Sequence, residues 1–204
     1  MNLGGFIGAA VLLTLMPGPD ILFVITQSIT RGKKAGIVFA LGLCTGLIFH
    51  VLAVSLGISV LIYRSETAFT VLKFAGTAYL IYLGVKAFMG RKRATLRFDA
   101  PSAGESRLYR KGILMNILNP KVILFFLAFF PQFVDVNSGS PVWQMLLLGF
   151  LFMVQAIVIF SLVAVLADKL SVRLMRNPEM AYWMNVAEAL IYCLIGISIL
   201  FIEH

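Results

Sequence analysis

The chain of 204 residues is 60% hydrophobic and only 13% charged, and its mean hydropathy is +0.96. A soluble domain of this size could not bury so much apolar surface, so the composition excludes an ordinary globular protein and favours a single domain, residues 1–204, embedded in lipid. The net charge of +8 does not indicate nucleic-acid binding, because the basic residues sit in short loops between apolar runs rather than along one stripe.

Six apolar runs are long enough to cross a bilayer as helices. They cover roughly residues 3–26, 36–62, 68–89, 112–130, 142–167 and 181–202. The first run lacks a basic start and a small-residue cleavage site, so we expect it to be retained rather than removed as a signal peptide. The sequence therefore predicts an all-α integral membrane protein with about six transmembrane helices.

The loops between these runs predict the orientation of the chain. The basic residues in the loops after the first, third and fifth runs are Arg31, Lys33, Lys34, Arg91, Lys92, Arg93, Arg97, Arg107, Arg110, Lys111, Lys169, Arg173 and Arg176. The alternate loops hold only Arg64. Because basic loops stay in the cytoplasm, the long loop 90–111 is expected to be cytoplasmic and both termini are expected outside.

Two of the predicted spans carry helix-breaking residues and charge. The first contains Pro17, Gly18, Pro19 and Asp20, and the fourth contains Asn116, Asn119, Pro120 and Lys121. Proline removes a backbone donor, and broken backbone at membrane depth is tolerated only where protein or a wet cavity satisfies it. Interrupted helices in corresponding halves point to a transporter site, here with helices one to three and four to six as two inverted repeats.

The depth of the ionisable residues suggests a shared layer. At about 1.5 Å per residue from the cytoplasmic end, Asp20 and Glu188 lie roughly 10 Å deep, Lys121 about 13 Å and His50 about 20 Å. Charges in a membrane usually face a cavity or each other. Asp20, Glu188 and Lys121 are therefore expected to line the transport site, with an ion-paired packing cluster as the alternative. His50 is expected either to relay protons or to bond a neighbouring helix.

These residue types suit a zwitterionic amino acid. Its carboxylate needs a cation or free backbone N–H groups, which Lys121 or a restarting helix could supply. Its ammonium needs an anion, which Asp20 or Glu188 could supply. A carboxyl group buried in the membrane could also carry a coupling proton.

Small residues at helical spacing indicate close helix contacts. Gly42 and Gly46 are four residues apart in the second span, and Gly76 and Gly84 lie in the third. Such residues let helix backbones approach each other in lipid. We expect packing within the chain, with a homodimer interface as the alternative.

Several motifs follow one another through nearly the whole chain. They are Pro17-Gly18-Pro19-Asp20, Arg31-Gly32-Lys33-Lys34-Ala35-Gly36 with Gly42 and Gly46, residues 73–80 with Tyr82-Leu83-Gly84, and residues 112–116 with Asn119-Pro120-Lys121 and 129–133. In this order they resemble the LysE/RhtB family of exporters. The resemblance implies export of amino acids or related small metabolites across the cytoplasmic (inner) membrane of a prokaryote, driven by the proton gradient. The acid that many members carry in the second helix is missing here, where the sequence reads Leu47-Ile48-Phe49-His50.

Three other functions have thinner support. A divalent-metal exporter would find few ligands, since the only histidines are His50 and His204. A thiol carrier would have to use Cys44 and Cys193, and neither has a proline beside it. An intramembrane enzyme would need a nucleophile and a base, and no such pair stands out. We therefore expect no enzyme activity, no cofactor and no metal site.

Overall fold

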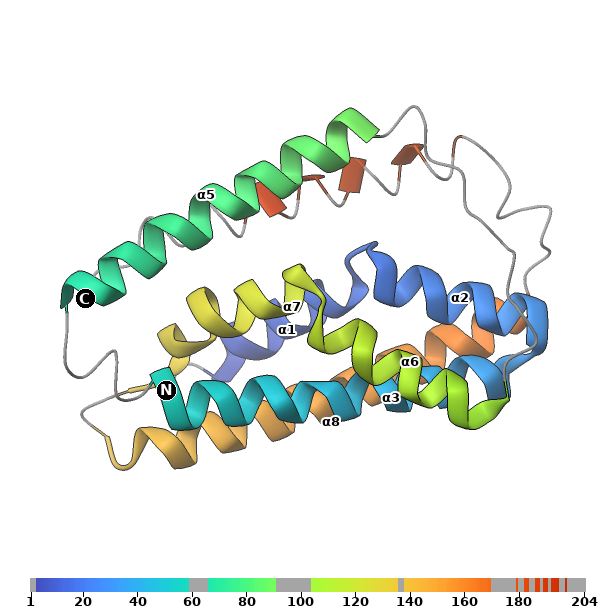
Figure 1. Cartoon of the computed structure of the whole chain (residues 1–204), viewed down its shortest axis with the longest axis horizontal. Helices are drawn as coiled ribbons and strands as arrows, with labels where there is room; N and C mark the ends of the chain where they lie inside the picture. The colour runs from blue at the N-terminus through green and yellow to red at the C-terminus, as the bar shows by residue number, and fades with distance from the viewer. Residues whose placement is uncertain are drawn as a thin grey trace.

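The computed structural model describes residues 3–58, 66–90, 104–135 and 138–169 continuously. Near the C-terminus it describes residues 179, 182, 183, 186, 187, 189, 190, 192–194 and 197. Every regular element in these parts is helical, which confirms the predicted all-α class (Figure 1). Most of the predicted span 181–202, including Glu188, lies outside the described residues.

The first predicted span is two helices rather than one. Helix α1 runs over Leu3–Leu15 and α2 over Pro19–Arg31, and their axes are bent by 55°. The span 3–26 is thus broken at the predicted place, because Pro17 and Pro19 cannot donate the backbone hydrogen bonds that would continue one helix. Helix α2 ends at Gly32, whose φ of +84° lies in the region that favours glycine.

The next elements follow the predictions with shifted ends. Helix α3 covers Lys33–Ala53 and widens into the π-helix η1, Val54–Ile58. Helix α5 covers Glu66–Gly90 without a break. Helix α8 covers Pro141–Asp168, close to the predicted 142–167.

The fourth predicted span is also broken. Helix α6 covers Glu105–Ile117 and so begins well before the predicted residue 112. The break falls at Leu118 and Asn119, and the chain resumes as α7, Pro120–Leu124. It continues as the π-helix η2, Phe125–Phe129, and the 3-10 turn η3, Phe130–Phe133. Proline at the start of α7 fits a first helical position, where no N–H is needed.

Length and apolarity identify fewer certain spans than six. Within the described ranges, Lys33–Gly57 and Pro141–Asp168 are long and apolar enough to cross a membrane, and the bent pair α1 and α2 makes a third if it is one span. The protein is therefore helical and fit for a membrane, and the count of six stays a prediction.

Glycine lets α3 and α6 pack backbone against backbone. A Cβ added to Gly42 would collide with the carbonyl oxygen of Tyr109, and one added to Gly112 would collide with that of Phe39. A Cβ on Gly46 would come within 2.7 Å of the Asn116 Cβ. The expected packing role of Gly42 and Gly46 is thus met inside the chain, because α6 covers both.

Helix α5 and the described C-terminal residues form a second layer beside the other helices (Figure 1). The two are in close contact, since a Cβ on Gly84 would lie 2.9 Å from the Cys193 Sγ and 3.1 Å from the Ala189 carbonyl oxygen. Tyr192 joins this layer to the rest of the molecule, because its side chain is buried in the main hydrophobic core.

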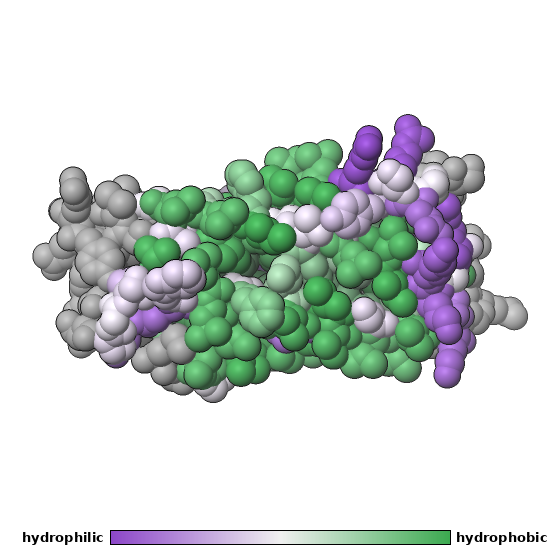
Figure 2. All heavy atoms as spheres, turned by 90° about the horizontal axis from the view of Figure 1, so that it is seen from below, coloured by the Kyte–Doolittle hydropathy of each residue, from purple (hydrophilic) through white to green (hydrophobic). Residues whose placement is uncertain are grey.

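One end of the molecule is charged and the surface beyond it is apolar (Figure 2). At this end Lys34 Nζ lies 2.8 Å from Glu105 Oε1, joining the starts of α3 and α6. The backbone N–H of Lys33 also donates to Asp168 Oδ1 at 3.1 Å, which ties α3 to the end of α8.

Phenylalanine rings fill the other half of the core. Phe6 packs edge-on to Phe130 and Phe133 at 5.6 and 5.3 Å between ring centroids. Further rings in contact with these are Phe125, Phe126, Phe129 and Phe152. This phenylalanine cluster closes the space between α1, α8 and the η2–η3 segment.

Candidate functional site

The break between α1 and α2 leaves backbone oxygens without helical partners. In a continuous helix the Leu13 carbonyl would accept from the N–H of residue 17, but Pro17 has none. Lys121 of α7 fills this place: its Nζ donates to the carbonyl oxygens of Leu13 at 3.2 Å and of Met16 at 3.3 Å. The end of α1 is therefore capped by a side chain more than a hundred residues away.

The same ammonium forms an ion pair with Asp20 in the first turn of α2. Lys121 Nζ lies 2.8 Å from Asp20 Oδ2 and 2.9 Å from Oδ1. Lys121 is 1% exposed and Asp20 3% exposed. A buried charge needs a partner and further hydrogen bonds, and the two carbonyls supply these. All three ammonium protons are thus used.

The charges also match the helix dipoles. The ammonium sits at the end of α1, where the dipole is negative, and the Asp20 carboxylate sits at the start of α2, where it is positive. Gly18 lies between them: a Cβ there would be 2.9 Å from Asp20 Oδ1 and 3.2 Å from Lys121 Nζ. The short run Pro17–Asp20 therefore frees the carbonyls, leaves room for the lysine and provides its counter-charge.

At the second break a basic side chain from another helix again binds a backbone carbonyl near a proline. Pro120 cannot donate to the Asn116 carbonyl, and His50 of α3 approaches that oxygen with Nε2 at 3.2 Å. Since a carbonyl only accepts, Nε2 carries the ring proton. Asn119 caps α7 with its Oδ1, which accepts from the Lys121 N–H at 3.1 Å. At both breaks a basic side chain from another helix thus binds a carbonyl that proline cannot reach, although the Asn116 carbonyl also accepts from the Asn119 N–H at 3.0 Å.

Two amide groups beside this second break are buried and incompletely bonded. Asn116 is 3% exposed and Asn119 2% exposed. Among the described residues, neither Asn116 Oδ1 nor Asn119 Nδ2 has a hydrogen-bond partner. A buried amide atom without a partner costs free energy, so such groups are candidates for contact with water or a ligand.

The structure brings some predicted residues together and separates others. Asp20 and Lys121 are in direct contact as a buried ion pair, and their place in a transport site stays a prediction. His50 bonds Asn116 and stacks on Phe126, with ring centroids 5.7 Å apart. Glu188 lies outside the described residues. The carbonyls of Leu13 and Met16 were missed, although a proline four residues after Leu13 signals that its oxygen is free.

The residues that the rival functions would need lie partly outside the described ranges, as His204 does. Among the described residues no group of three or more His, Cys, Asp or Glu side chains could hold a metal ion. Cys44 is buried in the core around α3, and Cys193 packs against Gly84 of α5. The two thiols are not bonded to each other.

Comparison with known proteins supplies the family. The model of the LysE type translocator matches residues 11–202. The chain belongs to this family. As a member of this family, the protein is a membrane transporter with a small-molecule substrate. Its long apolar helices agree with a place in the membrane.

Its relatives are bacterial membrane proteins. It is 32% identical over 195 residues to the homoserine/homoserine lactone efflux proteins of Salmonella typhimurium and Salmonella typhi, covering 96% of this chain and 94% of each relative. It is 34% identical over 176 residues to the uncharacterised membrane protein YrhP of Bacillus subtilis, covering 82% of this chain and 83% of the relative. No solved structure matches the translocator.

Proposed function

We propose that this translocator is a secondary transporter that exports amino acids or related small metabolites from the cytoplasm and is coupled to the proton gradient. The observation that carries the proposal is the buried pair of Asp20 and Lys121 at a broken helix. Relatives that cover nearly the whole chain are named as efflux proteins for homoserine and its lactone. L-Homoserine is accordingly the first substrate to test.

The pair offers both halves of a zwitterion a partner. The ammonium of an incoming amino acid replaces that of Lys121 at Asp20, and the carboxylate takes the released lysine. The unpartnered amide atoms of Asn116 and Asn119 add an acceptor and a donor near the second break. Binding and release of substrate thus exchange one ion pair for another, without leaving a charge bare in the membrane.

Proton coupling needs a group that gains and loses a proton during the cycle. Asp20 is the first candidate, because its counter-charge is removed when Lys121 turns to the substrate. Glu188, predicted at similar depth, is the second candidate. His50 is the third, and its hydrogen bond to Asn116 and stacking on Phe126 also support a purely structural role.

We propose that this site lies in a single domain, residues 1–204, whose six transmembrane helices form two inverted three-helix repeats. The breaks at Pro17–Asp20 and at Asn119–Lys121 fall in the first helix of each repeat, and each joins a basic side chain to a freed carbonyl. The basic loops put both termini outside the prokaryotic inner membrane. A homodimer would use faces other than Gly42 and Gly46.

The test is uptake into everted membrane vesicles, whose outer surface is the cytoplasmic one. Vesicles with an imposed pH gradient are offered a panel of labelled amino acids that includes L-homoserine, together with its lactone. Uptake of one or a few compounds, abolished by an uncoupler, is the expected result. If the inserted, folded protein takes up none of them, or takes them up without regard to the gradient, the proposal is wrong.

A further inference from the structure

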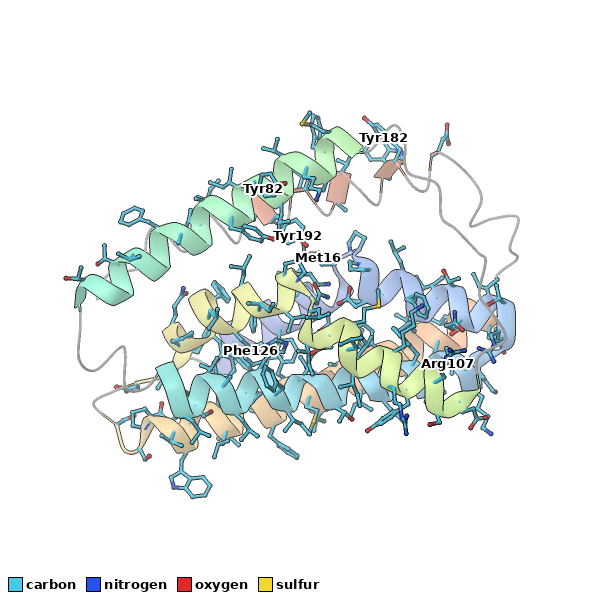
Figure 3. All side chains as sticks on the ribbon, viewed as in Figure 1. Met16, Tyr82, Arg107, Phe126, Tyr182 and Tyr192 are labelled. Atoms are coloured by element: carbon cyan, nitrogen blue, oxygen red, sulfur yellow. The ribbon has the colours of Figure 1, made fainter. Side chains whose placement is uncertain are left out.

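A pocket of about 470 Å³ opens between α2 and α6, near the charged end of the molecule. Apolar side chains and three cations line it: Phe23, Gln27, Arg107, Leu108, Arg110, Lys111 and Leu114. Arg107 lies on the part of α6 that runs beside the end of α2 (Figure 3). The volume exceeds that of a small amino acid, so a molecule of this class fits with some water.

The pocket shares a helix face with the ion pair. Gln27 follows Asp20 by seven residues, which is close to two helical turns and about 10 Å along α2. Residues seven apart point in nearly the same direction, so Gln27 lies below Asp20 on the same side. A molecule bound beside Gln27 is therefore about 10 Å along α2 from the ion pair of Asp20 and Lys121.

The polar groups of the pocket come in two kinds. Arg107 and Arg110 are exposed at the mouth, and Lys111 holds its Nζ 4.1 Å from the centre of the Phe23 ring. Gln27 is only 1% exposed, and its Oε1 has no hydrogen-bond partner among the described residues. The pocket thus has cations at its rim and, in its wall, a buried amide whose oxygen is unsatisfied and can meet a ligand after rotation of the side chain.

We propose that this pocket is the cytoplasmic entry site, which holds an α-amino acid as a zwitterion before it reaches Asp20 and Lys121. The guanidinium groups of Arg107 and Arg110 bind the carboxylate, a geometry for which arginine is suited. The ammonium donates to Gln27 Oε1, and the side chain lies against Phe23 and Leu114. This inference rests on the proposed function, and it names the part of the substrate that is recognised first.

A phospholipid headgroup is the main competitor for a basic pocket at this depth. The acceptor favours the amino acid, because an ammonium is a charged donor, whereas the headgroup of phosphatidylglycerol can offer this oxygen only hydroxyl donors. The phenylalanine cluster, with Phe126, lies away from the charged end, whereas the pocket with Arg107 lies near it (Figure 3). A pocket at the end that the basic loops predict to be cytoplasmic is what an entry site for export requires.

The test compares two substrates that differ only in the carboxylate. Initial rates into everted vesicles are measured for the amino acid identified by the panel and for its methyl ester. In Arg107→Gln/Arg110→Gln we expect KM for the amino acid to rise about tenfold with kcat within twofold, and KM for the ester to stay unchanged. Gln27→Met keeps the length of the side chain and should raise KM for both.

Lys33→Gln is the matched control, since it removes an exposed charge at the same end but outside the pocket, and both KM values should stay as in the wild type. An unchanged KM for the amino acid in the double arginine variant overturns the inference. An equal rise for acid and ester, reversed by changing the phosphatidylglycerol content of reconstituted vesicles, also overturns it and assigns the pocket to lipid. If the wild type transports nothing, the proposed function itself has failed.

Discussion

Lys121 and Asp20 bind each other across the gap between α1 and α2, with Nζ 2.8 Å from Oδ2 and both side chains buried. Lysine also holds the last carbonyls of α1, so one side chain joins α7, α1 and α2. Changes at either partner are therefore expected to affect both the stability and the transport of the protein.

Replacing Asp20 by asparagine should leave the Lys121 ammonium buried without a counter-charge. Loss of one partner of a buried pair costs about 3–5 kcal/mol, so we expect Asp20→Asn to lower Tm in detergent by several degrees. The double variant Asp20→Asn/Lys121→Met removes both charges and should recover much of this loss. Neither variant should transport. Melting curves and vesicle uptake on the same preparations check both statements.

The exposed pair provides the control for that experiment. Lys34→Met breaks the contact with Glu105, and exposed ion pairs contribute little, so Tm should be nearly unchanged. If the double variant of Asp20 and Lys121 melts as low as the single one, the buried charge is not the cause of the loss.

Gly42→Ala should disturb the contact between α3 and α6. The added methyl group would collide with the Tyr109 carbonyl, and backbone cannot rotate away as a side chain can. Overpacking of this kind costs about 1–3 kcal/mol, measured as a lower Tm. Gly8→Ala in α1 is the matched control, because its new Cβ has nothing within 4 Å and Tm should not fall. Equal effects of the two substitutions would contradict the packing argument.

His50→Gln separates the structural role of this histidine from a proton relay. Glutamine keeps a donor for the Asn116 carbonyl but cannot titrate. We expect uptake driven by the pH gradient to stay within about twofold of the wild type. His50→Leu removes the donor as well and should lower stability by about 0.5–1.5 kcal/mol. Loss of gradient dependence in His50→Gln alone would instead assign the relay to His50.

Single cysteines can test the orientation. After replacement of Cys44 and Cys193 by alanine, Ser106→Cys and Ser138→Cys place thiols at exposed positions in the first turn of α6 and before α8. The basic loops predict that a membrane-impermeant maleimide labels Ser138→Cys in intact cells and Ser106→Cys only in everted vesicles. The reverse pattern would put the termini in the cytoplasm. Normal uptake by the cysteine-free protein would also dismiss the thiol carrier.

Composition and local rules predict a good part of this protein. Apolar runs predict the helical class, and the prolines predict where α1 and α6 are interrupted, because a missing N–H acts locally. Depth along the membrane axis also places Asp20 and Lys121 in one layer. Such predictions need only the position of each residue along the chain or along the membrane axis.

Other features depend on how helices lie side by side, which local rules applied to a single sequence do not predict. The contact of His50 with Asn116 needs α3 beside α6, and the pocket needs α2 beside the start of α6. From the sequence, Arg107 and Lys111 are interpreted only as basic loop residues that orient the chain in the membrane. Gln27 could have been found from its place two turns after Asp20, but a lone glutamine in an apolar run more often bonds a neighbouring helix.

The broken helix at Pro17 and Pro19 also affects how readily the protein would leak ions when it carries no cargo. In the cycle proposed above, Lys121 leaves α1, and the carbonyls of Leu13 and Met16 then lose a donor that in lipid only water or the ammonium of a cargo molecule can replace. That cycle therefore makes opening without cargo unfavourable and predicts that the empty protein stays shut. A membrane that stores energy as an ion gradient needs this property in each of its carriers, because a carrier that opens when empty would discharge the gradient.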